Sequence, residues 1–321
     1  MPVSEVNSVT KEGAELGRFL FYDPLLSSDS SISCASCHIQ KYAFSGGPVS
    51  FSKGIAEFET VRNTLPLFNL AWNKSMFWDG RVKTIEDQVS IPIIDHKEMH
   101  GDWNVILERL NKSERYDSLF MSAFGSTEKD SLMVIKAIAQ FERTLISANS
   151  RFDSVLRREA VFTKEEFEGF EIVNDQTRGN CLHCHTTDAN ALGTTGLLSN
   201  NGFQKANRKE DYSDIGAGAR NGDSSLYGWF KIPSLRNLAF TAPYMHNGSL
   251  TSIDEVLKFY QSGIQYAYNI DSKLLLGSHH SGVNITDDEL LKIEAFLNTL
   301  NDFDFIQNPK FSNPFPTKKG N

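Results

Sequence analysis

Two short motifs constrain this chain more than any other feature. Residues 34–38 (CASCH) and 181–185 (CLHCH) both read C-x-x-C-H, and together they contain all four cysteines of the 321-residue sequence. This spacing is typical of c-type haem attachment, in which both thiols bond to haem vinyl groups and the histidine becomes the proximal iron ligand. We therefore predict two covalently attached haem c groups. The predicted attachment residues and proximal ligands are Cys34, Cys37, His38, Cys181, Cys184 and His185.

Other uses of a C-x-x-C pair fit the sequence less well. A zinc ribbon needs two such pairs, but usually about 15–20 residues apart, whereas these pairs lie in separate halves of the chain. A thioredoxin-like dithiol needs a βαβ context, and no such pattern is evident. A haem-free metal, dithiol or disulfide protein stays as an alternative, and the absence of a Soret band would establish it.

Length and composition set the remaining bounds. A chain of 321 residues with 40% hydrophobic and 22% charged residues is typical of a globular protein with two domains. No apolar run approaches the ~18–20 residues of a membrane span, and the net charge of −8 argues against a nucleic-acid partner. The first residues show no signal-peptide pattern. Because bacterial haem c attachment belongs to the periplasmic side, we expect a periplasmic protein whose signal has been removed.

Hydrophobic periodicity predicts an all-α fold of two cytochrome c-like domains, each with one haem c. Each half has the order helix, haem motif, long loop, helix, and no alternating strand pattern of useful length appears. We expect an N-terminal domain over residues 1–160 and a C-terminal domain over 161–321, with residues 301–321 either packing on the N-terminal domain or mobile. Pro92 is expected to end a short helix that starts after Thr84. The main expected helices cover residues 10–22, 103–110, 116–124 and 131–147, and others start at Thr163, Ser252 and Thr286.

The sixth ligand position decides what each iron does, because an iron with an open face binds peroxide or oxygen. Residues 39–75, which follow the first motif, contain no histidine, methionine or cysteine. This favours an open first iron, with the more distant Met76, His96 and His100 as alternatives. Glu98 and Gln88 are candidates for moving a proton during peroxide cleavage, and solvated helix residues are the alternative.

Several side chains are candidates for the sixth ligand of the second iron. Tyr260 shares an apolar helical face with Ile253 and Leu257, so a core tyrosine is the alternative interpretation. The candidates are Met245, His246, Tyr260, His279 and His280.

Longer stretches resemble one family of proteins. The sequence resembles the bacterial di-haem cytochrome c peroxidases and their MauG-type relatives, and the resemblance spans nearly the whole chain. The matching stretches, besides CASCH, are residues 16–24 (LGRFLFYDP), 62–66 (RNTLP), 77–81 (FWDGR), 92–99 (PIIDHKEM), 232–237 (IPSLRN) and 242–248 (APYMHNG).

The resemblance implies roles for particular residues. It implies that the N-terminal haem is the peroxidatic one, that Glu98 is the catalytic glutamate and Gln88 the distal glutamine. It also implies that Trp78 lies between the haems as a relay for electrons or holes. A calcium ion is implied between the domains, held by oxygen atoms as a hard cation prefers. Its expected ligands are Asn63 and the backbone carbonyls of Thr241 and Pro243.

Two departures from the typical peroxidase resemble the MauG-type enzymes instead. The loop before Arg62, near Ile55, lacks the histidine that caps the peroxidatic iron in typical peroxidases. Tyr260, fourteen residues after His246, stands where the typical peroxidase has a methionine ligand. A phenolate is a hard, anionic ligand, so it stabilises ferric iron and lowers the reduction potential relative to methionine.

These features predict a periplasmic peroxidase that reduces hydrogen peroxide with electrons from an external donor, such as a small cytochrome c or a cupredoxin. The absent capping histidine predicts activity without prior reduction. A MauG-type enzyme that oxidises a side chain of a protein substrate is the first alternative, and a non-catalytic di-haem electron carrier is the second. The resemblance also suggests a homodimer.

Overall fold

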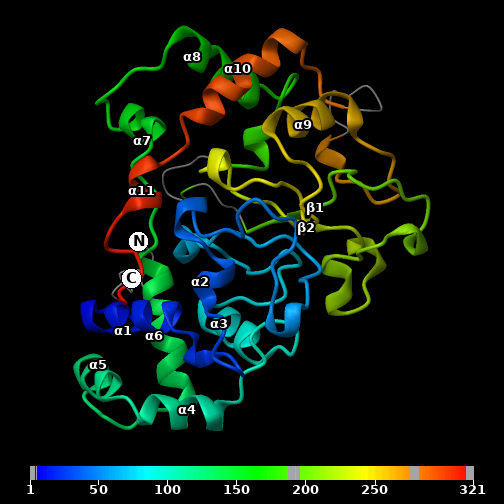
Figure 1. The fold of residues 1–321 in the computed structure, drawn as a ribbon. Coiled ribbons are helices and arrows are strands. Elements are labelled where there is room, and N and C mark those ends of the chain that lie inside the picture. Colours follow the sequence, from blue (N-terminus) through cyan, green and yellow to red (C-terminus); the bar gives the residue numbers. More distant parts are fainter. Residues whose placement is uncertain (1–3, 5, 187–191, 193–195, 275–281, 316–321) are drawn as a thin grey trace, which may run out of the picture. The chain divides into compact units, whose positions relative to one another are not determined.

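The computed structural model describes residues 4, 6–186, 192, 196–274 and 282–315, and most of its regular structure is helical (Figure 1). The α-helices are α1 (Lys11–Tyr22), α2 (Cys34–Cys37), α3 (Ile85–Ile94), α4 (Trp103–Asn111), α5 (Glu114–Phe124), α6 (Ser131–Thr144), α7 (Arg151–Leu156), α8 (Lys164–Asn174), α9 (Ile253–Lys258), α10 (Asp287–Asn298) and α11 (Phe303–Gln307).

The chain forms two compact units. The first contains Met1–Ala71, Thr84–Ile146 and Asp304–Asn321, and the second contains Trp72–Lys83 and Ser147–Phe303. This division differs from the expected boundary near residue 160 in two ways. The chain passes into the second unit already at Ser147, and residues 72–83 belong to that unit although they precede most of the first half's helices.

Hydrogen bonds explain why residues 72–83 group with the second unit. The Lys231 backbone N–H donates to the Trp78 carbonyl at 2.6 Å, and the Ser75 hydroxyl donates to the Gly196 carbonyl at 3.0 Å. These bonds join segments that are far apart in sequence, so a local sequence pattern cannot predict them.

The C-terminal tail groups with the first unit. Tyr22 donates from its hydroxyl to the Phe311 carbonyl at 2.8 Å, and the Gln40 side chain donates to the Asn308 carbonyl at 2.8 Å. Phe305 adds a ring contact with Phe44, with centroids 5.7 Å apart. The start of the tail is therefore tied to the first unit by polar and aromatic contacts.

In the first unit, α1 crosses α6 at a glycine (Figure 1). Thr10 caps α1 by accepting from the Gly13 N–H at 3.0 Å, which satisfies one of the free donors at the helix start. A Cβ atom on Gly17 would lie 1.9 Å from the Ala137 carbonyl oxygen. Only glycine therefore allows the two helices to approach this closely, and Leu16 and Leu20 are fully buried in the same unit.

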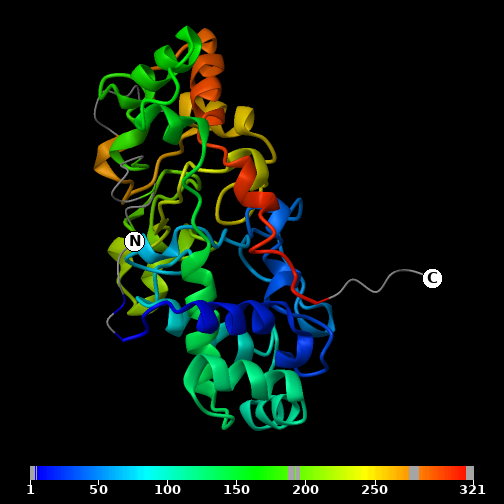
Figure 2. The same ribbon diagram turned by 90° about the vertical axis from the view of Figure 1, so that its left-hand side faces the viewer.

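The second unit repeats this arrangement with α8 and α10. A Cβ atom on Gly169 would lie 1.9 Å from the Lys292 carbonyl oxygen and 2.9 Å from the Cβ of Phe296. Both views show α8 beside α10 (Figures 1 and 2). Thr163 caps α8 together with Glu166, as the sequence predicts. Each unit thus contains one helix crossing at a glycine, and one helix of each crossing, α1 or α8, also contacts the turn that carries the C-x-x-C-H motif.

Helix α3 does not end at Pro92, and that prediction is wrong. The helix runs on to Ile94 with Pro92 inside it. The turn that follows folds back, because the Pro92 carbonyl accepts from the Met99 N–H at 3.1 Å and the Asp95 carbonyl accepts from the Glu98 N–H at 3.1 Å. These bonds stabilise the end of the helix despite the missing proline N–H.

Strand structure is minor in the described part of the chain. Strand β1 (Leu198–Ser199) pairs antiparallel with β2 (Phe230–Lys231), with Leu198 opposite Lys231. Two-residue strands are too short to produce an alternating pattern. None of the helices in the described ranges has the length and apolar character needed to cross a bilayer.

Candidate haem sites

The first C-x-x-C-H motif forms a single helical turn, α2. The His38 N–H donates to the Cys34 carbonyl at 2.9 Å, and the Ser33 N–H donates to the Ser36 hydroxyl at 3.0 Å. In a helix, residues three apart lie on one face, so the turn presents both thiols on the same side. Cys34 and Cys37 are unpaired thiols, not a disulfide.

His38 is held in the orientation that an iron ligand needs. Its Nδ1 lies 2.8 Å from the Phe44 carbonyl oxygen, so the protonated Nδ1 donates there and the Nε2 lone pair points away. Burial lowers the pKa of His38 to about 4, against the opposing effect of the Phe44 and Leu65 carbonyls. A neutral imidazole whose second nitrogen is fixed by a carbonyl is the usual form of a metal-ligating histidine.

The second motif has the same construction. Residues Cys181–His183 form a 3₁₀ turn, and the His185 N–H donates to the Cys181 carbonyl at 2.8 Å. The Nδ1 of His185 lies 2.8 Å from the Pro233 carbonyl oxygen. Burial lowers the pKa of His185, and the Pro233 carbonyl opposes the shift. Cys181 and Cys184 are also unpaired. Both donor sets, two free thiols and a neutral, oriented imidazole, fit a covalently attached haem.

Glu98 lies near the first motif. Burial raises the pKa of Cys37, and the Glu98 carboxylate raises it further. The Glu98 carbonyl accepts from the Ile55 N–H at 2.8 Å, and a Cβ atom on Gly54 would lie 2.0 Å from the Lys97 carbonyl oxygen. The loop that lacks a histidine therefore packs directly on the backbone around Glu98, and glycine at position 54 permits this approach.

Gln88 carries an unusual polar atom on α3. Its Oε1 is buried and has no hydrogen-bond partner within the part of the chain that the structure describes. A buried acceptor without a partner is costly and rare, and such atoms often mark a place where a further group binds. Gln88 is therefore suited to bind an exogenous donor, such as water or peroxide.

Two of the three alternative ligands for the first iron are exposed to solvent. His96 and His100 are both solvent-exposed in the turn after α3, and His96 lies 3.7 Å from the Asp95 carboxylate. Met76 is buried but belongs to the second unit. The described residues of the first unit thus offer no enclosed histidine or methionine ligand besides His38 and Met99, which is buried beside Glu98 in the chain.

Tyr260 lies at the second motif. It belongs to a π-helical turn, Phe259–Gly263, that continues α9; such turns frequently occur at functional sites. Asn201 donates from Nδ2 to the Tyr260 hydroxyl at 3.1 Å. Burial raises the pKa of Tyr260 to about 12, and the thiols of Cys181 and Cys184 add to the shift while Asn201 opposes it. The phenol group is therefore close to both cysteines of the second motif.

The other candidates for the second iron have different surroundings. Met245 accepts a weak contact from the same Asn201 Nδ2, at 3.8 Å from its sulfur. The His246 ring stacks on Phe230, with centroids 3.8 Å apart and planes at 10°. His279 and His280 lie outside the described residues. Sequence reasoning missed Asn201, because an asparagine in a Gly/Asn-rich loop carries no distinguishing signal.

The arginines next to the family motifs are already paired with carboxylates. Arg236 forms two hydrogen bonds with Asp153, at 2.7 and 2.8 Å, and both residues are buried. Arg81 donates to Asp79 at 3.0 Å and lies over the Phe77 ring at 3.7 Å.

Lys231 was not singled out by the sequence. It is buried in β2, and burial lowers its pKa to about 8.

The expected calcium ligands are Asn63 in the first unit and the carbonyls of Thr241 and Pro243 in the second. Asn63 is buried, and its Nδ2 donates to the Val49 and Ser50 carbonyls at 3.3 and 3.2 Å. Thr241 and Pro243 follow a short 3₁₀ turn, Leu238–Phe240. The described residues contain no group of three or more His, Cys, Asp or Glu side chains that could hold a metal ion. Calcium bound by amide and carbonyl oxygens stays a prediction.

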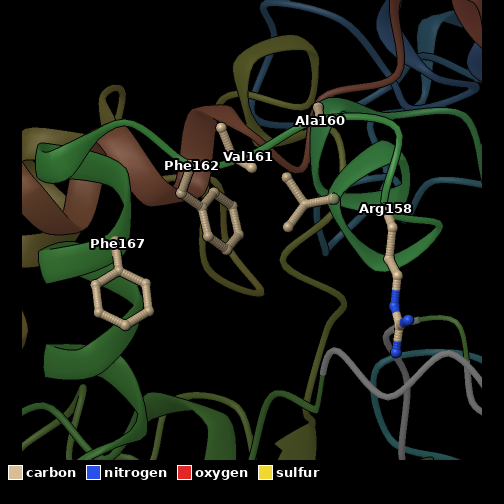
Figure 3. A pocket seen from close by; sticks show the side chains of 6 residues that line it. Arg158, Ala160, Val161, Phe162 and Phe167 are labelled. Atoms are coloured by element: carbon tan, nitrogen blue, oxygen red, sulfur yellow. The ribbon is translucent and has the colours of Figure 1, made fainter.

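A separate apolar pocket lies in the second unit, between α7 and α8 (Figure 3). It has a volume of about 410 Å³, and Arg158 is its single ionisable lining residue. Neither C-x-x-C-H motif contributes to it. The pocket is lined by Val155, Arg158, Ala160, Val161, Phe162 and Phe167.

Comparison with known proteins connects both motifs to one family. A family model described as di-haem cytochrome c peroxidase matches residues 11–161. The methylamine utilization protein MauG of Methylophilus methylotrophus is 33% identical over 269 residues, covering 82% of this chain and 76% of that protein. The cytochrome c551 peroxidase of Nitrosomonas europaea is 29% identical over 309 residues, covering 93% of this chain and 84% of that protein.

Solved structures show the same fold. A MauG-like protein associated with microbial copper homeostasis superposes with a TM-score of 0.87 and 31% identity, covering 98% of this chain and 97% of that one. The diheme peroxidase BthA from Burkholderia thailandensis superposes with a TM-score of 0.80 at 21% identity, covering 95% of this chain and 90% of that one, and supports the fold alone.

Proposed function

Because this chain belongs to the di-haem cytochrome c peroxidase and MauG family and is an oxidoreductase of that type, we propose that it is a periplasmic peroxidase. It reduces hydrogen peroxide to two water molecules, taking two electrons from an external donor and two protons from solvent. When bound, the two haems supply the redox-active iron centres. The proposed donor is a small cytochrome c or a cupredoxin, which delivers electrons through the second haem.

The surroundings of Glu98 carry this proposal. Its carboxylate acts on the thiols of the first motif, and a carboxylate at that place can move a proton between the two peroxide oxygens. Gln88 presents a buried Oε1, which has no hydrogen-bond partner among the described residues, as an acceptor for a peroxide or water hydrogen. Trp78 is the proposed relay for electrons or holes, and Tyr260 the proposed sixth ligand of the second iron. The calcium site of Asn63, Thr241 and Pro243 is proposed on the same resemblance.

EPR of the as-isolated ferric protein tests this function. We expect a high-spin ferric signal from the first haem and its loss on adding peroxide, without prior reduction, because the loop around Ile55 supplies no capping histidine. A protein with two six-coordinate low-spin irons and no reaction with peroxide would instead be a di-haem electron carrier. A protein without a Soret band would contain no haem at all.

A second candidate function has a specific observation in its favour. MauG-type enzymes oxidise a protein side chain, and the Tyr260 hydroxyl beside Cys181 and Cys184 favours this chemistry. A phenolate ligand stabilises oxidised iron more than methionine does. We propose that a protein substrate is the alternative electron source.

The Tyr260→Met exchange tests this candidate. We expect the variant to lose the ability to hold two oxidising equivalents after peroxide addition. Rapid-freeze EPR and optical spectroscopy measure these equivalents. The matched control is Tyr266→Met, since Tyr266 is 61% exposed in the same unit. Unchanged storage of both equivalents in the Tyr260→Met variant would remove the argument for this function.

A further inference from the structure

Lys231 is a buried cation that no carboxylate of the described residues neutralises. Only 7% of the residue is exposed, and no carboxylate within the described ranges forms an ion pair with its ammonium group. An isolated buried charge is strongly unfavourable, so a retained one indicates an anionic partner.

Three other cations with buried side chains each pair with a carboxylate. Arg236 pairs with Asp153 at 2.7 Å, Arg143 pairs with Glu86 at 2.7 Å, and Lys129 approaches Asp117 at 2.5 Å. The contrast indicates that the partner of Lys231 is supplied by something other than a described carboxylate.

The backbone places Lys231 beside the second haem motif. Its N–H donates to the Trp78 carbonyl at 2.6 Å, and the next residue, Ile232, donates to the Leu197 carbonyl at 2.9 Å. Two residues on, the Pro233 carbonyl accepts from His185 Nδ1. The positive charge of Lys231 also acts on the His185 imidazole. The ammonium group is therefore near the predicted proximal ligand of the second iron.

We propose that Lys231 binds a propionate carboxylate of the haem attached to Cys181 and Cys184. This inference rests on the proposed haem at that site. Attachment through the vinyl groups leaves the two propionates as the anionic groups of the cofactor, and the neighbouring Arg81 and Arg236 are already engaged by Asp79 and Asp153. The pairing neutralises the positive charge of the buried lysine and the negative charge of one propionate at the same time.

The pairing also has a consequence for the second iron. A cation close to the iron favours the ferrous over the ferric state, because the ferrous centre carries less positive charge. Lys231 therefore raises the reduction potential of this haem and opposes the lowering expected from a Tyr260 phenolate.

Two substitutions in the holoprotein separate charge from packing. Lys231→Met keeps the apolar stem and removes the charge, whereas Lys231→Arg keeps the charge. Lys205→Met is the control, since Lys205 is exposed in the same unit. The readouts are covalent haem content, by mass spectrometry, and the midpoint potential of the second haem, by redox titration of its low-spin EPR signal.

We expect Lys231→Met to shift the ferric/ferrous equilibrium of the second haem at least tenfold towards ferric, ~59 mV for a one-electron couple. Lys231→Arg and Lys205→Met should stay near wild type. If Lys231→Met accumulates with less haem at the second motif, recovery of haem in Lys231→Arg supports the pairing as well.

Full haem content and an unchanged potential in Lys231→Met would overturn the inference and leave the proposed function standing. Equal losses in the Met and Arg variants would also overturn it, because charge would then not be the property required. A wild-type protein without haem on Cys181 and Cys184 would overturn the proposed function and this inference together.

Discussion

Replacing Glu142 by glutamine should remove a pH dependence of stability that originates in the first unit. Glu142 lies on α6, is 3% exposed, and its Oε2 has no hydrogen-bond partner in the described part of the chain. Burial raises the pKa of Glu142 to about 8; Arg143 lowers it and Glu86 raises it further. Arg143 offers little compensation, because its guanidinium forms two hydrogen bonds with Glu86, at 2.7 and 2.8 Å.

The sign follows from proton binding. The pKa of an unfolded glutamate is 4.5 and that of folded Glu142 is about 8. Between pH 4.5 and pH 8, Glu142 is therefore protonated in the native state and deprotonated in the unfolded state. The free energy of unfolding contributed by Glu142 is therefore fully present below pH 4.5 and falls as the pH rises towards 8. With 1.36 kcal/mol per unit, the loss between pH 6 and pH 8 is about 2 kcal/mol.

The assay compares Glu142→Gln with wild type, so that all other titrating groups cancel. Urea unfolding of the holoprotein, followed by circular dichroism at pH 6, 7 and 8, gives the midpoint and slope of the transition that reports the first unit. The stability difference should move in favour of the variant by about 2 kcal/mol from pH 6 to pH 8. Glu128→Gln is the control, since Glu128 is exposed in the same unit. Parallel pH profiles for Glu142→Gln and wild type would refute the reasoning.

Two further predictions concern the second unit, and urea unfolding measures both. Gly169→Ala should lower the free energy of unfolding by about 1–3 kcal/mol or more, because the new Cβ would lie 1.9 Å from the Lys292 carbonyl oxygen. The control Glu171→Ala, on the exposed side of the same helix, should have little effect. Equal stabilities of these two variants would contradict a close crossing of α8 and α10. Asp153→Asn should cost about 3–5 kcal/mol by leaving the Arg236 cation buried and unpaired. Adding Arg236→Met to that variant should restore part of the loss, and no recovery would argue against an ion-pair effect.

Local sequence patterns were sufficient to predict the C-x-x-C-H motifs and most helices. The C-x-x-C-H strings place the thiols and the ligand within five residues, and a single turn is enough to present them. Helix α8 starts at its predicted capping box, Thr163 to Glu166. The same applies to α10, which is capped by Thr286 and Glu289.

Long-range contacts decided what local patterns could not. Pro92 was expected to end α3, but bonds from Met99 and the turn after the helix stabilise two further residues. Residues 72–83 join the second unit through hydrogen bonds to partners more than a hundred positions away. A glycine at a helix crossing, such as Gly17, becomes recognisable only when the opposing carbonyl is in place.

The sequence by itself determined that this chain carries two C-x-x-C-H motifs, a family resemblance and a tyrosine in place of a methionine. The tertiary structure decided that Tyr260 approaches the second motif with Asn201 as its donor, that Arg236 is engaged by Asp153, and that Lys231 is not engaged by a described carboxylate. The physical reason is one of range. Covalent attachment depends on atoms a few residues apart, whereas burial and charge compensation depend on whichever segments the fold brings together.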